Sequence, residues 1–466
     1  MMTLSLALRN LMRNRRRSLA TLLAMAIGAT SILLFGGYST NINYTMHTAY
    51  VQSGGHLQIQ HRDFYLYGSG NPTAYGIADH SKILAAIQND EVLRNMVLVA
   101  TPTLQFGGIA GNYAASVSRT IIANGFVAED VNRMRRWNDF GLSYDTPVFA
   151  LEGAPADAAI VGTGVARVLQ LCDALKIDRC PKPEKEQMPD GKPMPEDIAQ
   201  LSLQEAAAGS DVPPVGSARR IEVLAGNARG TPNVTSLEVI RAEDQGFKAV
   251  DEVYVMMHLA QAQQLIYGKS PPKVTSIILQ LRHSDQIPAA LVRLALILAS
   301  FSTSQPLAVL DFQTLNPFYV QTIQLFDTIF SFIFALIGAI VLFTVSNTMN
   351  TAVVERTVEI GTLRAIGLRR AGIRRLFVTE GALLGLCGTV LGVVLALLIS
   401  AIVNQLGLTW SAPGTVEPLP LMLRVWGEIG MIISTAFGLI CIAVLSAWWP
   451  AYRAAQLDVV DALRHV

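Results

Sequence analysis

Four long stretches of apolar residues stand out from the polar remainder of the chain. They cover residues 18–40, 323–349, 381–404 and 429–449, and Asp327 is the only charged residue among them. A helix needs roughly 20 apolar residues to cross the hydrocarbon core of a bilayer. The pattern therefore predicts a protein with four transmembrane helices.

The first stretch also has features of a cleaved signal peptide, because basic residues precede its apolar core. The core of a signal peptide is about 7–15 residues long, and this stretch is longer. We therefore predict a retained span. Cleavage would instead leave three spans and place the two chain ends on opposite sides of the membrane.

Arginine residues gather on one side of the predicted spans. Those that precede the first span, separate the second from the third, or follow the fourth are Arg9, Arg13, Arg15, Arg16, Arg17, Arg356, Arg364, Arg369, Arg370, Arg374, Arg375, Arg453 and Arg464. Because short cytoplasmic loops are rich in Lys and Arg, residues 1–17, 350–375 and 450–466 are predicted to be cytoplasmic. Residues 41–322 and the short loop 405–428 then lie outside the cytoplasm.

The N-terminal residues 4–17 have the period of a helix. Their apolar and basic faces consist of Leu4, Leu8 and Leu11 and of Arg9, Arg13 and Arg16. An amphipathic helix lying in the inner membrane interface fits this pattern. An ordinary basic topology anchor fits it as well.

Composition agrees with a membrane protein that has no nucleic-acid partner. Hydrophobic residues make up 51% of the 466 residues and charged residues 15%, whereas soluble proteins carry about 25% charged residues. The net charge of +1 gives no electrostatic reason to expect nucleic-acid binding.

The large segment between the first two spans mixes strand and helix patterns. Strands are predicted at 56–60, 159–162, 221–224 and 275–281, and helices at 259–266 and 289–299. This mixture predicts a large α+β periplasmic domain at 41–322.

One part of this domain has a different composition. Residues 178–215 combine seven prolines with many charged residues, so they bury little apolar surface and we predict a mobile insertion. It is either a plain surface loop or a contact for a partner. Nearby, Cys172 and Cys180 either form a disulfide outside the cytoplasm or remain two free thiols. Cys387 and Cys441 lie in apolar stretches and are predicted to be packing residues.

No catalytic or metal-binding motif is recognisable in the chain. The histidines at positions 47, 56, 61 and 80 match no metal-ligand spacing. Gly162-Thr163-Gly164 is too short for a phosphate-binding loop, and the sequence contains no G-x-x-x-x-G-K-[ST], H-E-x-x-H or G-x-S-x-G. We therefore predict that the chain is not an enzyme and carries neither metal nor cofactor.

The segment between the second and third spans has the most informative pattern. Residues 354–368 are predicted to form a helix of about three turns, in which Val354, Val358, Gly361 and Ala365 share one apolar face. Gly367 is placed as the glycine that ends it. A short charged helix between two spans is suited to docking a soluble partner, whereas a solvated loop would need only the arginines.

This segment resembles the coupling-helix motif of the FtsX/MacB/LolC-LolE permeases, the type VII ABC transporters. The matching residues are Glu355, Arg356, Glu359, Ile360, Gly361, Leu363, Arg364, Ala365 and Gly367. Further similarities to that family are Leu8-Arg9-Asn10-Leu11, the helix-packing glycines Gly381, Gly385, Gly388 and Gly392, and a tail from Pro450 to Arg464. The tail departs from the family at Val459, where a proline is usual, and His56-Leu57-Gln58-Ile59 is similar to the lipoprotein-releasing branch.

The resemblance implies a permease subunit in the bacterial inner membrane. Its ATPase, with ATP and Mg, would be a separate dimeric partner that docks on the coupling residues Glu355, Arg356, Glu359, Leu363 and Arg364, with close approach at Gly361. A second permease chain, identical or not, would complete the transporter, and hydrolysis would move the periplasmic domain.

The task implied is the release of lipoproteins or lipid from the membrane, with a lipoprotein carrier. MacB-like efflux with a periplasmic adaptor is the alternative within the family. A membrane sensor or scaffold is the alternative outside it. The acidic residues Asp327 and Glu380 are predicted to lie at the membrane interface rather than in a substrate site.

Overall fold

The structure is a computed structural model of the chain. It describes residues 6–7, 9–10, 13, 15–68, 70–142, 147–177, 219–227, 230–301, 305–410 and 419–457. The predicted insertion at 178–215, Cys180, the apolar face of the N-terminal helix and the tail beyond residue 457 lie outside these ranges. The predicted Cys172–Cys180 disulfide and the predicted amphipathic helix therefore stay predictions.

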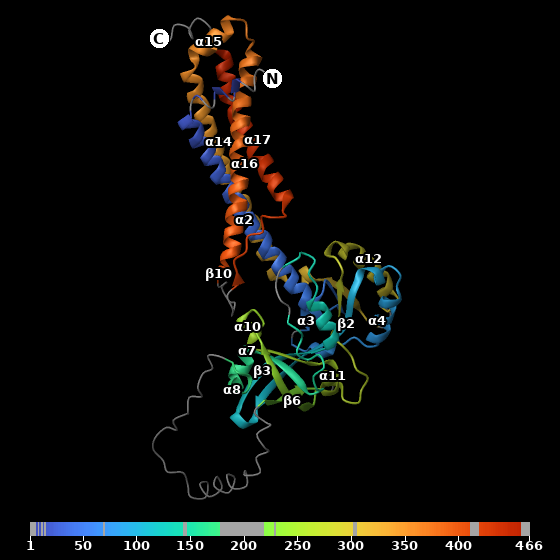
Figure 1. Cartoon of the computed structure of the whole chain (residues 1–466). Coiled ribbons are helices and arrows are strands. Elements are labelled where there is room, and N and C mark those ends of the chain that lie inside the picture. Colours follow the sequence, from blue (N-terminus) through green and yellow to red (C-terminus); the bar gives the residue numbers. More distant parts are fainter. Residues whose placement is uncertain are drawn as a thin grey trace, which may run out of the picture. The chain divides into compact units, whose positions relative to one another are not determined.

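The chain divides into two compact units (Figure 1). The helical unit comprises Met1–Met46, Phe318–Trp410 and Leu419–Val466. The α+β unit comprises His47–Pro317 and Ser411–Pro418.

Four long helices dominate the membrane part: α2 (Arg15–Gly54), α14 (Pro317–Glu355), α16 (Arg370–Leu406) and α17 (Ile429–Gln456). The short helix α15 (Thr357–Ala365) connects α14 to α16, and strands β10 (Thr409–Trp410) and β11 (Leu419–Pro420) pair before α17. Within the described ranges, these four helices are long and apolar enough to cross a membrane, which confirms the predicted spans. Each extends beyond its predicted apolar stretch, because backbone hydrogen bonding continues where the hydrocarbon ends.

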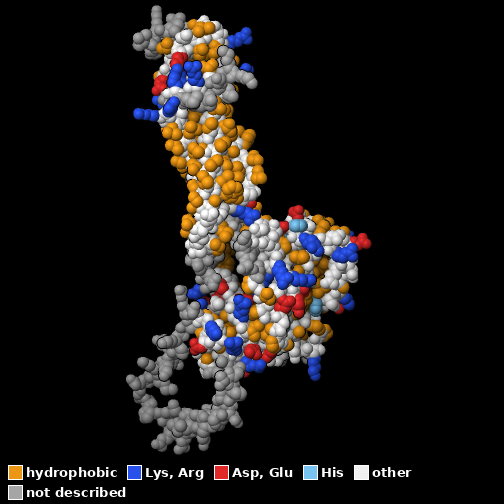
Figure 2. All heavy atoms as spheres, in the orientation of Figure 1, with side chains coloured by type: hydrophobic (Ala, Val, Ile, Leu, Met, Phe, Trp, Pro, Cys, Tyr) orange, Lys and Arg blue, Asp and Glu red, His pale blue; other side chains and the backbone are white. Residues whose placement is uncertain are grey.

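The helical unit presents a belt of hydrophobic side chains, and charged side chains gather at the end that carries α15 (Figure 2). Large exposed residues in α14, α16 and α17 contribute to this surface, among them Phe332, Phe343, Leu398 and Phe437. Such a large exposed apolar surface is unfavourable in water. It suits contact with lipid tails, so the chain is a multi-pass membrane protein.

The four glycines of α16 lie at helix–helix contacts. Gly381 and Gly385 face α17, whereas Gly388 and Gly392 face α2. A Cβ atom at Gly392 would lie only 2.5 Å from the Cβ of Ala29. Small residues at such positions allow the backbones of membrane helices to approach closely.

The α+β unit contains nine strands, which confirms the predicted fold class. They are β1 (Leu57–His61), β2 (Val97–Asn112), β3 (Val117–Phe126), β4 (Ala158–Gly162), β5 (Arg220–Gly226), β6 (Pro232–Glu243), β7 (Tyr254–His258), β8 (Ser276–Leu281) and β9 (Leu307–Asp311). The predicted strands at 56–60, 159–162, 221–224 and 275–281 correspond to β1, β4, β5 and β8.

Short helices fill the connections of this unit. They are α3 (Phe64–Tyr67), α4 (His80–Asn89), α5 (Leu93–Met96), α6 (Ala128–Arg135), α7 (Thr163–Val168), α8 (Cys172–Leu175), α10 (Lys248–Asp251), α11 (Leu259–Tyr267), α12 (Ile287–Ala299) and α13 (Phe312–Leu315). The predicted helices at 259–266 and 289–299 correspond to α11 and α12. Single-turn 3-10 helices occur at Pro72–Tyr75, Tyr113–Ala115 and Ser284–Gln286.

Four strands form an antiparallel sheet in the order β2-β8-β1-β9. Helix α4 lies between β1 and β2 in the chain, and α12 between β8 and β9. This is the split β-α-β arrangement, with a long insertion between its second and third strands. The insertion contains β3 to β7.

Strand β2 belongs to two sheets. Its first half pairs with β8, whereas residues 104–112 pair with β3. Pairings β3–β7, β7–β4, β4–β6, β6–β5 and β5–β2 close a ring of six strands. Strand β2 was not predicted, because its strand pattern is interrupted by Pro102, Gly107, Gly108 and Gly111.

The Gly162-Thr163-Gly164 turn binds a carboxylate of the chain itself. Buried Asp251 accepts hydrogen bonds from the N–H groups of Thr163 and Gly164, at 2.8 and 2.7 Å. The Thr163 hydroxyl donates a third bond to it, at 2.5 Å. The donors at the start of α7 are thus engaged within the fold, and the turn has a structural role.

Two histidines of the α+β unit meet at Ser284. His56 Nε2 lies 3.1 Å and His47 Nε2 lies 2.9 Å from the Ser284 Oγ. The backbone N–H of Leu281 donates to His56 Nδ1 at 2.9 Å. Because Nδ1 accepts this bond, the neutral ring carries its proton on Nε2. The ring of Trp137 lies 4.9 Å from that of His56.

Acidification is expected to destabilise the α+β unit through His56. Burial, assisted by His47 and opposed by Asp139, lowers the pKa of His56 from 6.5 to about 3. The unfolded chain thus binds a proton that the folded unit excludes. The contribution of His56 to the free energy of unfolding is complete above pH 6.5 and falls by about 1.4 kcal/mol per pH unit below it.

Amide hydrogen exchange at Leu281 in the full chain, corrected for the intrinsic rate at each pH, measures this loss. His56→Asn keeps an acceptor for the Leu281 N–H and should reduce the slope, and the part that remains comes from the neighbouring His47. A slope that is identical in wild type and H56N would contradict the assignment to His56.

Candidate functional site

The helix from the second span is interrupted at Arg356. Its φ and ψ angles of −109° and 17° are not helical, so α14 ends at Glu355 and α15 starts at Thr357. The predicted helix of three turns is therefore wrong in its extent. The interruption rotates the residues that follow it, and this changes which side chains face the other helices.

Arg356 forms a buried ion pair with Glu380 of α16. The Arg356 Nη1 lies 2.9 and 3.2 Å from the two carboxylate oxygens, and the side chains are 10% and 2% exposed. The side-chain Nδ2 of Asn10 donates a hydrogen bond to the same carboxylate at 2.6 Å, and the backbone carbonyl oxygen of Asn10 accepts one from Arg356 Nη2 at 3.2 Å. The charge of Glu380 is therefore satisfied between the helices of the helical unit, and its predicted position at the membrane interface stays a prediction.

Two further ion pairs join the N-terminal segment to this region. Arg17 contacts Glu355 at 2.7 Å, and Arg13 contacts Glu359 at 2.6 Å. All four side chains retain substantial exposure, so each pair contributes little stability by itself. The two pairs nevertheless attach the N-terminal segment to one residue before the interruption at Arg356 and to one residue after it.

The far end of α15 is fixed in two ways. Arg364 donates to the carbonyl oxygen of Leu457, the residue that follows α17. Gly367 has a φ of 104°, and the N–H groups of Gly367 and Leu368 bond to the carbonyls of Arg364 and Leu363, each at 3.0 Å. This is a Schellman motif, which confirms the predicted glycine end of the helix.

Apolar side chains of α15 are divided between an inner and an outer face. Ile360 and Gly361 are buried, and Leu363 packs against the core of the helical unit. By contrast, Val358 is 47% and Ile366 is 79% exposed.

The predicted apolar face of Val354, Val358, Gly361 and Ala365 is therefore wrong. Gly361 is buried, whereas the other three residues are exposed. We call the exposed residues Val354, Val358, Ile366 and Leu368 the outer apolar patch.

The predicted coupling residues are brought together, but in unequal roles. Arg356 is buried, and Glu355, Glu359 and Arg364 each bond to other parts of the chain. Among the described residues, the side chains of the outer apolar patch form no such hydrogen bond or ion pair. Sequence reasoning missed Asn10 and Glu380 as members of this site. A charged residue at the predicted start of a span was the available signal for Glu380, whereas nothing in the sequence pointed to Asn10 as its partner.

Comparison with known proteins finds a family match for part of this region. Residues 328–459 match the FtsX-like permease C-terminal family. The macrolide export ATP-binding/permease protein MacB of Shigella boydii is 40% identical over 143 residues, which is 31% of this chain and 20% of MacB. The lipoprotein-releasing system transmembrane protein LolC of Neisseria meningitidis is 27% identical over 244 residues, which is 50% of this chain and 56% of LolC. The chain thus matches less than two thirds of either relative.

Among solved structures, the periplasmic region of MacB from Actinobacillus actinomycetemcomitans is similar to this chain. It has 12% sequence identity and a TM-score of 0.30, and the match covers 57% of this chain and 94% of that one.

Proposed function

We propose that the chain is the membrane subunit of an ABC transporter that couples ATP hydrolysis by a partner to motion of its α+β unit. The match of residues 328–459 to the FtsX-like permease C-terminal family supports this proposal. The partner is an ABC ATPase dimer that binds ATP and Mg on the cytoplasmic side. A second permease chain completes the membrane part. Catalysis belongs to the ATPase and not to this chain.

The observation that carries this proposal is the combination of exposed and fixed parts in α15. Each residue of the outer apolar patch has an exposed charged residue within three positions in the sequence, and these are Glu355, Glu359 and Arg369. Exposed apolar residues with a charged rim are typical of a protein–protein contact. A helix of this kind fits a groove on a soluble partner.

The fixed contacts supply the transmission of force. Arg356 ties the start of α15 to α16, and Arg364 ties its end to the residue after α17. Glu359 adds a contact to the N-terminal segment. Movement of α15 by a docked ATPase would therefore be passed to several helices together rather than absorbed in a loose loop.

Arginine placement supports a cytoplasmic position for α15. Arg369, Arg370, Arg374 and Arg375 follow it directly, and cytoplasmic loops are enriched in such residues. The α+β unit would then be periplasmic, and both chain ends would be cytoplasmic.

For the substrate, we favour lipoprotein or lipid release. The similarity to LolC extends over half of this chain, whereas the similarity to MacB covers 31% of it. Macrolide-type export with a periplasmic adaptor is the alternative. Release of a lipoprotein from proteoliposomes to a soluble carrier, against export of a macrolide from the same preparation, separates the two.

Replacing Val358 and Ile366 with aspartate is expected to abolish ATPase docking. Two buried carboxylates without partners would oppose contact with an apolar groove, and binding should fall by at least about 100-fold. The measurement is ATPase recovered with the affinity-tagged full chain from a strain that expresses both. Val250→Asp, at an exposed apolar position of α10, is the matched control and should leave recovery unchanged.

Glu359→Lys tests the charged rim in the same preparation. It places two cations together at the Arg13 contact, so ATPase stimulation should drop while membrane insertion stays normal. Wild-type stimulation in this variant would rule out a role for Glu359, and full ATPase recovery with the double aspartate variant would overturn the docking proposal.

A further inference from the structure

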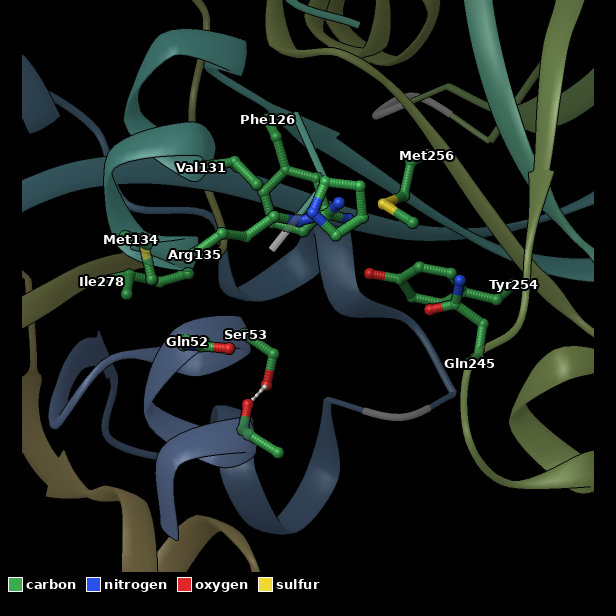
Figure 3. A pocket seen from close by; sticks show the side chains of 12 residues that line it. Gln52, Ser53, Phe126, Val131, Met134, Arg135, Gln245, Tyr254, Met256 and Ile278 are labelled. Atoms are coloured by element: carbon green, nitrogen blue, oxygen red, sulfur yellow. Dashed lines mark hydrogen bonds between the residues drawn. The ribbon is translucent and has the colours of Figure 1, made fainter. Parts of the chain in front are cut away.

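The α+β unit contains a cavity of about 390 Å³ between the last turns of α2, helix α6 and the strands β7 and β8 (Figure 3). One wall is apolar and is formed by Phe126, Val131, Met134, Met256 and Ile278. Protein interiors rarely leave voids larger than a water molecule. A cavity of this size falls within the range of small-molecule sites.

Two polar groups reach into this cavity from opposite sides (Figure 3). The Arg135 guanidinium lies 4.6 Å from the centre of the Phe149 ring, and its Nη2 lies 2.8 Å from Glu243. This is the one hydrogen-bonded partner that Arg135 has among the described residues. The rest of its fork of donors remains available for a ligand oxygen.

Tyr254 supplies the second polar group. Its hydroxyl is directed at the cavity in Figure 3. Burial raises the pKa of Tyr254, so its hydroxyl stays protonated and is able to donate a hydrogen bond at neutral pH. Arg135 and Tyr254 together offer donors from two directions.

We propose that this cavity binds a small amphipathic anion, with its apolar chain or ring against the methionine-containing wall and its acidic head between Arg135 and Tyr254. Methionine side chains adapt to apolar ligands of different shape. Ala49 and Ser53 form an exposed part of the lining, which gives such a molecule a way in. The inference goes beyond the proposed function and does not depend on the ATPase.

Binding of radiolabelled decanoate to the full chain in nanodiscs tests the proposal. Equilibrium dialysis against protein-free nanodiscs of the same lipid removes the contribution of partition into lipid. We expect saturable binding of decanoate. Decanol, which has the same chain without the charge, should compete for the site at least tenfold more weakly than unlabelled decanoate. Non-saturable uptake equal to that of the protein-free nanodiscs would overturn the proposal.

Two pairs of variants locate the site. Ala49→Phe fills the cavity from its exposed wall and should weaken decanoate binding at least tenfold, whereas Ala85→Phe, on the exposed side of α4, should leave it unchanged. Arg135→Gln should remove the preference for decanoate over decanol, and Arg135→Lys should retain most of it.

Thermal unfolding of each variant shows whether it is folded. If Arg135→Gln proves unfolded, the binding of decanoate by Ala49→Phe and the preference for decanoate in Arg135→Lys still test whether the anion binds in this cavity. Wild-type binding by Ala49→Phe would place the anion elsewhere. Loss of the preference for decanoate over decanol in Arg135→Lys would show that the carboxylate of the ligand does not bind beside the positive charge at position 135.

Discussion

Arg356→Ala is expected to eliminate ATPase-coupled activity and to destabilise the helical unit by about 3–5 kcal/mol. The substitution leaves the carboxylate of Glu380 buried at 2% side-chain exposure, with only Asn10 as a hydrogen-bonded partner among the described residues. An unpaired charge at such a position is far more costly than the loss of an exposed ion pair. It also removes the contact that holds the start of α15 against α16.

Stability and coupling can be measured separately in this variant. Thermal unfolding in nanodiscs reports stability, and stimulation of the partner ATPase reports coupling. Arg375→Ala removes an exposed arginine of α16, the helix that carries Glu380, and serves as the control for loss of a positive charge. We expect it to retain both properties.

A double substitution distinguishes the charge from the contact. Arg356→Met with Glu380→Leu removes both buried charges, and pairs replaced by apolar residues of similar volume are often as stable as the original. We therefore expect the thermal stability of the double variant to return toward that of the wild type. Recovery of ATPase stimulation in the double variant would show that apolar packing between these two positions suffices for coupling. Normal coupling in Arg356→Ala itself would contradict a role for the ion pair in transmission.

Gly392→Leu is expected to prevent assembly of the helical unit. Even a Cβ atom at this position would lie 2.5 Å from the Cβ of Ala29 and 2.7 Å from the carbonyl oxygen of Ala26. The Thr30 hydroxyl bonds to the Gly392 carbonyl at 3.0 Å across the same contact. A leucine would force α2 and α16 apart, lose this hydrogen bond and cost more than the about 1–3 kcal/mol typical of overpacking.

The yield of folded chain in the membrane, followed by resistance to protease, measures this effect. Gly430→Leu is the matched control, because a Cβ atom there would have no neighbour within 4 Å. Equal yields of Gly392→Leu and Gly430→Leu would show that α2 and α16 do not need close approach at this position.

Local patterns predicted the spans and several strands because each depends on residues that are neighbours in sequence. Apolar length alone identifies a membrane helix, and period-two alternation identified β1 and β8. The glycine end of α15 was predictable for the same reason, since Gly367 and its partners lie within five positions of one another.

Long-range pairings were not predictable in this way. Glu380 meets Asn10 across 370 positions, and no single-sequence pattern encodes such a contact. The interruption at Arg356 was missed because helix-favouring residues continue on both sides of it, whereas the buried ion pair overrides their local preference. The histidine pair at Ser284 and the division of β2 between two sheets are likewise products of tertiary packing.

The placement of β1 has a consequence for biogenesis. Both neighbours of β1, namely β8 and β9, come more than 200 positions later in the chain. With the α+β unit outside the cytoplasm, as proposed, the backbone donors of β1 would wait for partners until nearly the entire segment before α14 has been exported. The ring of β2 to β7 needs none of these late residues and is able to fold first. A pause in export between residues 258 and 276, after β7 and before β8, should thus leave a protease-resistant ring beside an unpaired, aggregation-prone β1.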